Sequence, residues 1–88
     1  MEAYSLSQTE KTRITVDIYG TQYIIVGTES ASHIRHVASM VDEKMREIYS
    51  KNPSLDTNKL AVLTAINAVN DYLKIKEQLD QQKNELKK

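Results

Sequence analysis

Two histidines are the residues of this chain whose type and spacing best suit metal chemistry. His33 and His36 stand three positions apart, so on a helix both imidazoles would project from one side and could share a zinc ion. A zinc site needs further protein ligands, and neither a cysteine nor an evident third ligand accompanies the pair. We therefore expect two partly exposed histidines and no metal. A small metal-binding protein remains an alternative that rests on this pair alone.

No other group of residues has a spacing typical of catalysis. The sequence contains no nucleophile constellation, no Gly-rich phosphate loop and no His-Glu-x-x-His helix. We interpret Asp42, Glu43 and Glu47 as a solvated helix face. The 12 basic and 12 acidic residues are interspersed and leave no basic stripe for a nucleic acid. The chain is therefore not expected to be an enzyme, to hold a cofactor or to bind nucleic acid.

The length of the chain makes self-association the expected source of stability. A domain of 88 residues buries a small share of its surface, and without cysteines it has no disulfides to compensate. The sequence has no apolar run long enough to cross a membrane and no secretory signal at its start. These features predict a soluble cytoplasmic protein with no membrane insertion. Residues 1–10 are polar and without period, and are predicted to be a disordered arm.

The stretch RITVDIYGTQYIIVG predicts a β-hairpin. Apolar and polar residues alternate before the glycine at the strand period of two. The Gly-Thr pair at 20–21 matches a two-residue type II′ turn. That turn would place Ile18 opposite Tyr23 and Val16 opposite Ile25. These apolar pairs would share one face, which another element must cover.

A first helix is predicted after residue 27, capped by Thr28 or Ser30 and ended before Pro53. Asp42 and Arg46 form an i,i+4 pair on its solvent side. Its apolar residues follow the helical period and form one stripe: Ile34, Val37, Ala38, Val41, Met45, Ile48 and Tyr49.

A second helix is predicted from about residue 57 nearly to the end, capped by Ser54 or Asp56. One apolar stripe, assigned to the head of the same subunit, consists of Val62, Ile66, Val69 and Leu73. A second stripe continues further and follows a heptad; its residues are Ala61, Ala65, Ala68, Tyr72, Ile75, Leu79 and Leu86. We expect the second stripe to face another subunit. The polar residues Asn67, Asn70 and Asp71 are predicted to contact a loop or a partner.

Together these elements predict an α+β fold. The hairpin and the short first helix form a small head over residues 11–56. The helix over residues 57–88 packs on the head with its first half and forms an intersubunit coiled coil with its second half.

The segments VDIYGTQYII, HVASMVDEKMREI and NKLAVLTAINAVNDYL resemble, in this order, the ZapA family of bacterial cell-division proteins. The resemblance covers residues 11–73, with the coil following. It implies a non-enzymatic partner of FtsZ, the tubulin-like GTPase of the mid-cell division ring. It also implies dimers that join through the coil into tetramers with heads at opposite ends, and thereby crosslink filaments. The coil here is short compared with longer members of the family.

The resemblance does not say which surface would contact FtsZ. By elimination it should be polar, on the head and outside both stripes. Basic residues are favoured because FtsZ is expected to be acidic. The candidates are Thr21, Gln22, Arg35, Arg46, Asn58 and Lys59. The alternative function is a generic coiled-coil scaffold that binds no filament.

Overall fold

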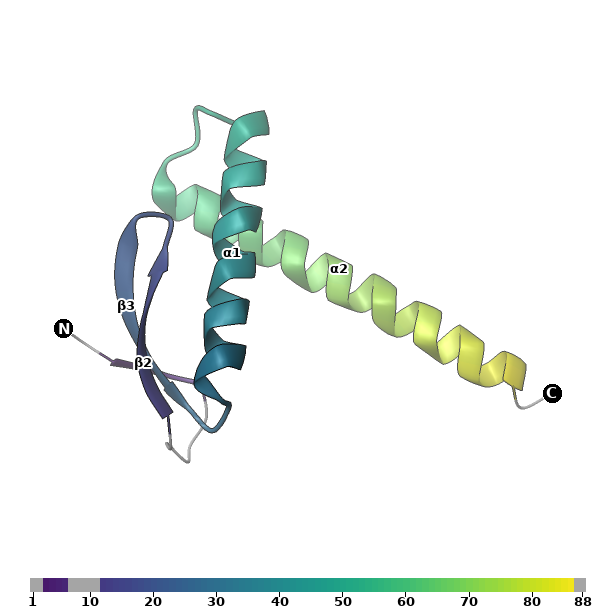
Figure 1. Ribbon diagram of the computed structural model, residues 1–88. Helices are drawn as coiled ribbons and strands as arrows, with labels where there is room; N and C mark the ends of the chain where they lie inside the picture. The colour runs from purple at the N-terminus through teal and green to yellow at the C-terminus, as the bar shows by residue number, and fades with distance from the viewer. Residues whose placement is uncertain (1–2, 7–11, 87–88) are drawn as a thin grey trace. The chain divides into compact units, whose positions relative to one another are not determined.

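The computed structural model of the protein describes residues 3–6 and 12–86, without the side chains of residues 84–86. Its elements are β1 (Ala3–Ser5), β2 (Thr12–Ile18), β3 (Thr21–Gly27), α1 (Ala31–Lys51) and α2 (Thr57–Leu86) (Figure 1). The predicted α+β class, with a long C-terminal helix, is confirmed. The chain divides into two compact units, Met1–Pro53 and Ser54–Lys88, which we describe in turn.

The first unit contains a sheet of three strands in the order β1-β3-β2. β2 and β3 form the predicted antiparallel hairpin, and β1 runs parallel to β3 on its other side. The prediction of a disordered arm is therefore wrong for Ala3–Ser5, whereas residues 1–2 and 7–10 lie outside the described part of the chain. A strand of three residues is too short to show a period of two, so its pattern could not reveal it.

Contacts with β3 hold β1 in place. The backbone N–H of Leu6 donates to the carbonyl oxygen of Val26 over 2.8 Å. The ring of Tyr4 meets the ring of Tyr23 edge to face, with 5.9 Å between the centroids. Such aromatic pairs stabilise beyond the area that they bury. The contacts with β3, and not a pattern in its own sequence, therefore define β1 as a strand.

The hairpin turn is made by Tyr19 and Gly20, whose φ angles are +50° and +80°. Positive φ at both central residues is the mark of a type I′ turn, whose twist matches that of the flanking strands. The predicted type II′ turn at residues 20–21 is therefore wrong. A tyrosine at positive φ is uncommon, so its environment must hold it there.

The turn sets the register of the hairpin. Ile18 pairs with Thr21, and Val16 with Tyr23. The predicted pairing of Val16 with Ile25 is therefore wrong by two residues, as is that of Ile18 with Tyr23. A shift of two leaves every side chain on its predicted face, so the predicted apolar face is correct.

α1 covers this apolar face of the hairpin. The buried core consists of Ile14, Val16, Ile34 and Ala38, and the half-buried residues packed against it are Ile18, Tyr23, Ile25 and Ala31. Ser30 caps the helix, because its hydroxyl accepts the backbone N–H of His33 over 3.2 Å. The sequence pattern also predicts Val37 and Tyr49 on the core side of α1, but both are exposed.

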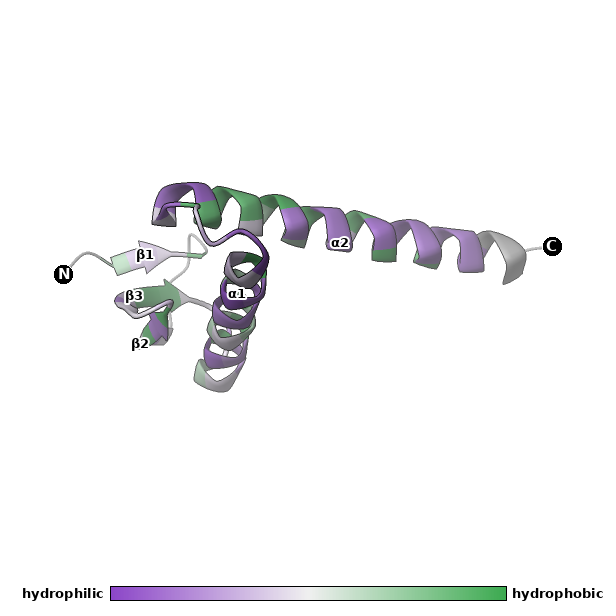
Figure 2. Cartoon of the chain, turned by 90° about the horizontal axis from the view of Figure 1, so that it is seen from above, coloured by the Kyte–Doolittle hydropathy of each residue, from purple (hydrophilic) through white to green (hydrophobic). Residues whose placement is uncertain are grey.

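The second unit is dominated by α2, a helix of 30 residues. It begins where predicted: the carboxylate of Asp56 accepts the backbone N–H of Lys59 over 2.8 Å. At 1.5 Å per residue the helix is about 45 Å long. Apolar segments recur along it (green in Figure 2). Within the described residues, no helix is both long and apolar enough to cross a membrane.

Candidate protein-binding surfaces

The hairpin turn is fastened to α1 by one carboxylate. Oδ1 of Asp42 accepts the backbone N–H of Tyr19 over 2.7 Å, and Oδ2 accepts Nε–H of Arg46 over 2.9 Å. These two bonds, that of Arg46 foremost, lower the pKa of Asp42 below its usual value of 3.8. The same pairing raises the pKa of Arg46. Asp42 therefore stays ionised and holds the turn over most of the pH range.

Aromatic contacts complete this anchor. The guanidinium carbon of Arg46 lies 5.5 Å from the centre of the Tyr19 ring, a cation–π distance. The ring of Tyr19 also meets that of Tyr49 edge to face at 6.2 Å. Sequence reasoning missed this cluster because 23 residues separate Tyr19 from Asp42. An i,i+4 pair is visible in a sequence, but its third partner on a distant turn is not.

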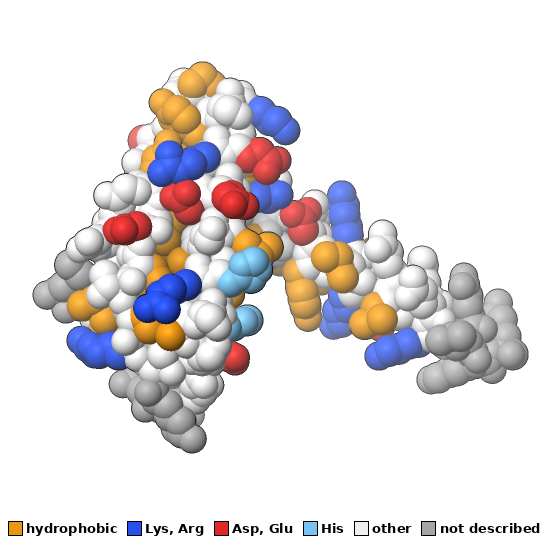
Figure 3. Space-filling model, viewed as in Figure 1, with side chains coloured by type: hydrophobic (Ala, Val, Ile, Leu, Met, Phe, Trp, Pro, Cys, Tyr) orange, Lys and Arg blue, Asp and Glu red, His pale blue; other side chains and the backbone are white. Residues whose placement is uncertain are grey.

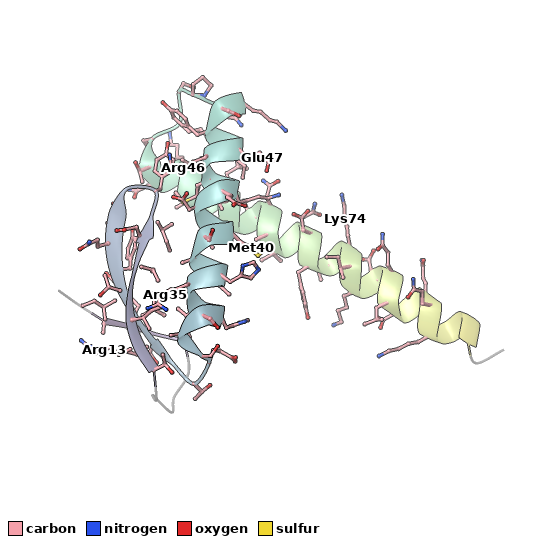
Figure 4. The ribbon with its side chains drawn as sticks, viewed as in Figure 1. Arg13, Arg35, Met40, Arg46, Glu47 and Lys74 are labelled. Carbon is pink, nitrogen blue, oxygen red and sulfur yellow. The ribbon has the colours of Figure 1, made fainter. Side chains whose placement is uncertain are left out.

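Beside this anchor lies an open hollow of about 630 Å³, which we call the β2–α1 groove. Its lining comes from β2, the turn and α1: Thr15, Val16, Asp17, Gly20, Arg35, Ala38, Ser39, Asp42 and Arg46. Two candidate partner-binding residues, Arg35 and Arg46, meet here, and both side chains reach from α1 toward the strands (Figure 4). Arg46 is occupied by Asp42. Arg35, by contrast, makes no ion pair with any residue that the structure describes.

The other two candidates on the first unit lie at the start of β3. Thr21 and Gln22 are exposed and pair with Ile18 and Asp17 of β2. They follow the turn rather than form its tip. Their side chains point to opposite faces of the sheet, as those of successive strand residues must. A single partner surface on one face of the sheet would contact one of them.

The side chains of α2 differ widely in exposure. Its protected side carries Leu60 and Thr64, which are buried, and Leu63 and Asn67, which are half-buried. The residues of the stripe assigned to the head of the same subunit are exposed: Val62 60%, Ile66 59%, Val69 57% and Leu73 48%. Hydrophobic side chains accordingly appear on the surface of α2 in Figure 3.

Two hydrogen bonds within α2 explain why polar residues lie on its protected side. The hydroxyl of Thr64 donates to the carbonyl oxygen of Leu60 over 2.7 Å. The side-chain amide of Asn67 donates to the carbonyl oxygen of Leu63 over 3.0 Å. Both polar groups are satisfied by their own helix, so their positions can be protected from water at little cost. The expected contact of Asn67 with a loop or partner stays a prediction.

The two apolar stripes of α2 together form a broad exposed surface. Stepping about 100° per residue from Leu60, the stripe from Val62 to Leu73 lies at about 180–240° and the heptad stripe at about 60–140°. We call both together the α2 apolar face; its exposed residues are Ala61, Val62, Ala65, Ile66, Ala68, Val69, Tyr72, Leu73, Ile75 and Leu79. The side chain of Leu86, predicted to belong here, lies outside those described.

The last two partner-binding candidates border this face. Asn58 and Lys59 line a shallow hollow of about 420 Å³ together with Leu55, Val62, Leu63 and Ile66. A second hollow of about 430 Å³ follows along the helix between Ala65 and Leu73. Hollows along an apolar helix face are the places into which a partner's side chains fit. Asn58 and Lys59 therefore belong to the edge of the α2 apolar face and not to the β2–α1 groove.

The histidine pair lies on the surface of α1. His33 and His36 are exposed on α1. Among the described residues, no group of three or more His, Cys, Asp or Glu side chains could hold a metal ion.

Comparison with known proteins identifies the family. A family model described as "Cell division protein ZapA" matches residues 14–88. This chain belongs to the ZapA family. The matched span includes β2 from Ile14 onward, all of β3, the residues that line the β2–α1 groove and the whole of α2. Both surfaces described above therefore lie within the part of the chain that the family shares.

Individual relatives cover nearly the whole chain. It is similar to Cell division protein ZapA of Bacillus licheniformis, with 65% identity over 93% of this chain and 96% of the relative. The protein of the same name from Geobacillus sp. (strain WCH70) is 69% identical over 85% and 86%.

One similar solved structure is titled "ZapA mutant dimer from Geobacillus stearothermophilus". The TM-score is 0.71 and the identity 51%, over 94% of this chain and 95% of that one. Members of the family are cell division proteins, and the solved relative is a dimer.

Proposed function

We propose that this protein binds FtsZ filaments at the division ring and crosslinks them as a dimer or tetramer. Membership of the ZapA family supports the role in division. The observation that carries the crosslinking part is the α2 apolar face, which one chain leaves uncovered.

Association through this face is strongly favoured by its composition. Burying a whole Val, Ile or Leu side chain is worth about 1.5–3 kcal/mol. Ile66, with 59% of its surface still exposed, would therefore contribute about 1–2 kcal/mol on association. Exposed contiguous apolar patches of this kind mark protein interfaces. Several such side chains on each of two copies offset the entropy lost on association.

The width of the face favours an assembly larger than a pair of helices. A two-stranded coiled coil covers a narrow seam of a and d positions. The two stripes of α2 lie about 110° apart, so one partner helix cannot cover both. We infer that elements of more than one copy pack around α2, in agreement with a dimer that joins a second dimer.

Crosslinking then follows from geometry. An assembly that carries several heads can engage two filaments at once, and each weak contact gains from the others. The contact residues are proposed to be Arg35 and its polar neighbours on the head, with Thr21, Gln22, Asn58 and Lys59 as further candidates. Arg46 is proposed to act at the same surface, mainly by holding the turn through Asp42.

Co-sedimentation with polymerised FtsZ tests the proposal. FtsZ filaments are assembled with GTP at fixed salt, because charge contacts weaken as ionic strength rises, and are centrifuged with and without this protein. We expect the protein in the pellet together with more filament mass. A Leu79→Glu variant is the matched control: it should still bind filaments but bring down less mass.

A protein that stays in the supernatant and leaves filament mass unchanged would contradict filament binding. The α2 apolar face would then support the alternative, a scaffold built from copies of this chain alone.

A further inference from the structure

β2 is an edge strand with unused backbone groups. Among the described strands it pairs only with β3. The residues that flank a two-residue turn form a hydrogen-bonded pair, and such pairs alternate along the ladder. Ile18 and Val16 therefore point their N–H and C=O groups toward β3. The backbone groups of Arg13, Thr15 and Asp17 point the other way, to the open edge.

The β2–α1 groove lies directly beside this edge. Thr15 and Asp17 contribute to its lining from β2. The opposite wall is α1, which runs alongside β2. Ile34 and Ala38 of α1 pack against Ile14 and Val16 of β2. Asp42 of α1 bonds to the turn that follows β2. An exposed strand edge next to a helix is the arrangement in which an extended peptide adds to a sheet as a further strand.

The same arrangement disfavours a second copy of this chain as the occupant. A two-fold axis would pair β2 with its own copy in antiparallel fashion and place both α1 helices on the same side of the joint sheet. Paired strands lie about 4.8 Å apart. Helices need about 8–10 Å between their axes. Because α1 packs over β2, the two helices would collide, whereas a strand without a helix fits.

The charges of the groove indicate what such a strand should carry. Arg46 is neutralised by Asp42. Arg35 has no ion-pair partner among the described residues. Asp17 also lines the groove. Val16 and Ile18 face α1, so the side chain of Asp17 between them, like that of Arg13, lies on the opposite face of the sheet. A carboxylate on the incoming strand could pair with the Arg35 guanidinium, whose N–H donors suit a carboxylate. Val16 and Ala38 also line the groove and offer small apolar surfaces to the side chains of the incoming strand.

We propose that the β2–α1 groove binds an extended acidic segment of a protein partner as a fourth strand, hydrogen-bonded to the outward backbone of Arg13, Thr15 and Asp17, with a carboxylate on Arg35. This inference deepens the proposed filament binding, because it names the contact by which the head binds its partner. It rests on that function only for the partner's identity, since the groove can be tested with a synthetic peptide.

The probe is the peptide acetyl-Val-Thr-Glu-Thr-Val-amide, which presents two valines and the glutamate on one face. Backbone amide exchange is followed by NMR with and without the peptide at millimolar concentration. We expect the amides of Arg13, Thr15 and Asp17 to exchange at least about fivefold more slowly when the peptide is bound. The same peptide with Lys in place of Glu should bind about tenfold more weakly. Unchanged exchange at these amides would overturn the proposal.

Variants of the chain give a second test. Thr15→Pro removes one outward N–H without touching the ladder to β3, and proline is tolerated on an edge strand; Thr15→Val keeps that N–H. Peptide affinity should fall about tenfold in the first and stay within twofold in the second. Arg35→Glu should abolish the preference for the Glu peptide, whereas Lys74→Glu on α2, an equal change of net charge, should not. Equal losses in both members of either pair would overturn the proposal.

FtsZ filaments separate this inference from the proposed function. If wild-type protein co-pellets with filaments but the three outward amides gain no protection, filament binding stands and the groove is not its site. If the peptide protects these amides while filaments do not co-pellet, the groove binds another acidic partner and the proposed function fails. If neither binds, both fail.

Discussion

Replacement of Ile66 by alanine separates the two possible roles of the first α2 stripe. The side chain is 59% exposed in one chain. If it faced the head of its own subunit, truncation would lower the free energy of unfolding. If it faces another copy, truncation would instead weaken the association of the two copies. We expect the second outcome, because Val62 and Val69 beside it are equally uncovered.

The expected magnitude follows from the exposed fraction. Ile66 has about 1–2 kcal/mol to gain on burial. A two-fold interface counts the change twice, so the free energy of dimerisation should fall by about 2–4 kcal/mol. Each 1.4 kcal/mol is a factor of ten in the dissociation constant, which should therefore rise about 30- to 700-fold.

Sedimentation equilibrium over a range of concentrations measures this constant directly. Lys74→Ala is the matched control, because Lys74 is exposed on the same helix but lies outside both stripes and outside the hollows beside them. It should leave the dissociation constant within a few-fold of wild type. A dissociation constant unchanged in Ile66→Ala, with a loss of folded stability in its place, would refute the reasoning and return this stripe to the subunit's own core.

Three further perturbations test other parts of the structure. Asp42→Asn should destabilise the first unit at pH 7. Because the folded pKa of Asp42 lies below 3.8, the stability that wild type gains from this carboxylate should be lost as the pH falls through the folded pKa. Urea unfolding that shows the same difference between wild type and variant at pH 7 and pH 3 would refute the anchor. Leu60→Ala should cost about 2–5 kcal/mol of unfolding free energy in thermal or urea denaturation, because only 1% of Leu60 is exposed; a cost below that of Val62→Ala would contradict the burial pattern. Leu79→Glu should lower the assembly mass in light scattering while circular dichroism still reports a folded head, and an unchanged mass would remove the heptad stripe from the interface.

The hairpin shows how far sequence reasoning reaches. Alternation of apolar residues was enough to predict both strands and their buried face, because one face of the sheet must be covered. It was not enough to choose between two turns that both contain Gly20. The choice depends on Asp42, which accepts the N–H of Tyr19, and on Arg46, which stacks on its ring. These contacts hold a tyrosine at positive φ, and local propensity gives no hint of them.

α2 shows that an apolar pattern alone does not predict which side of a helix is buried. Counting hydrophobic residues predicts that Val62 and Ile66 are covered by the head and that Thr64 is not. In the structure Val62 and Ile66 are exposed and Thr64 is buried, because the Thr64 hydroxyl bonds back to its own helix and can then leave water. The candidate partner-binding residues were likewise chosen by elimination, and they fall into three separate places. Arg35 and Arg46 share the β2–α1 groove, and Asn58 and Lys59 share a hollow on α2.

The two proposed surfaces differ in chemistry, and this difference bears on mechanism. The α2 apolar face relies on burial of hydrocarbon, which salt does not weaken. The β2–α1 groove relies on Arg35 and backbone hydrogen bonds, of which the ionic part is screened by salt. Raising the ionic strength should therefore release filaments from assemblies that remain intact. Because bundling needs several heads at once, it should be lost at lower salt than binding of the protein to single filaments. Loss of both at one salt concentration, together with dissociation of the assembly, would mean that a single surface serves both purposes.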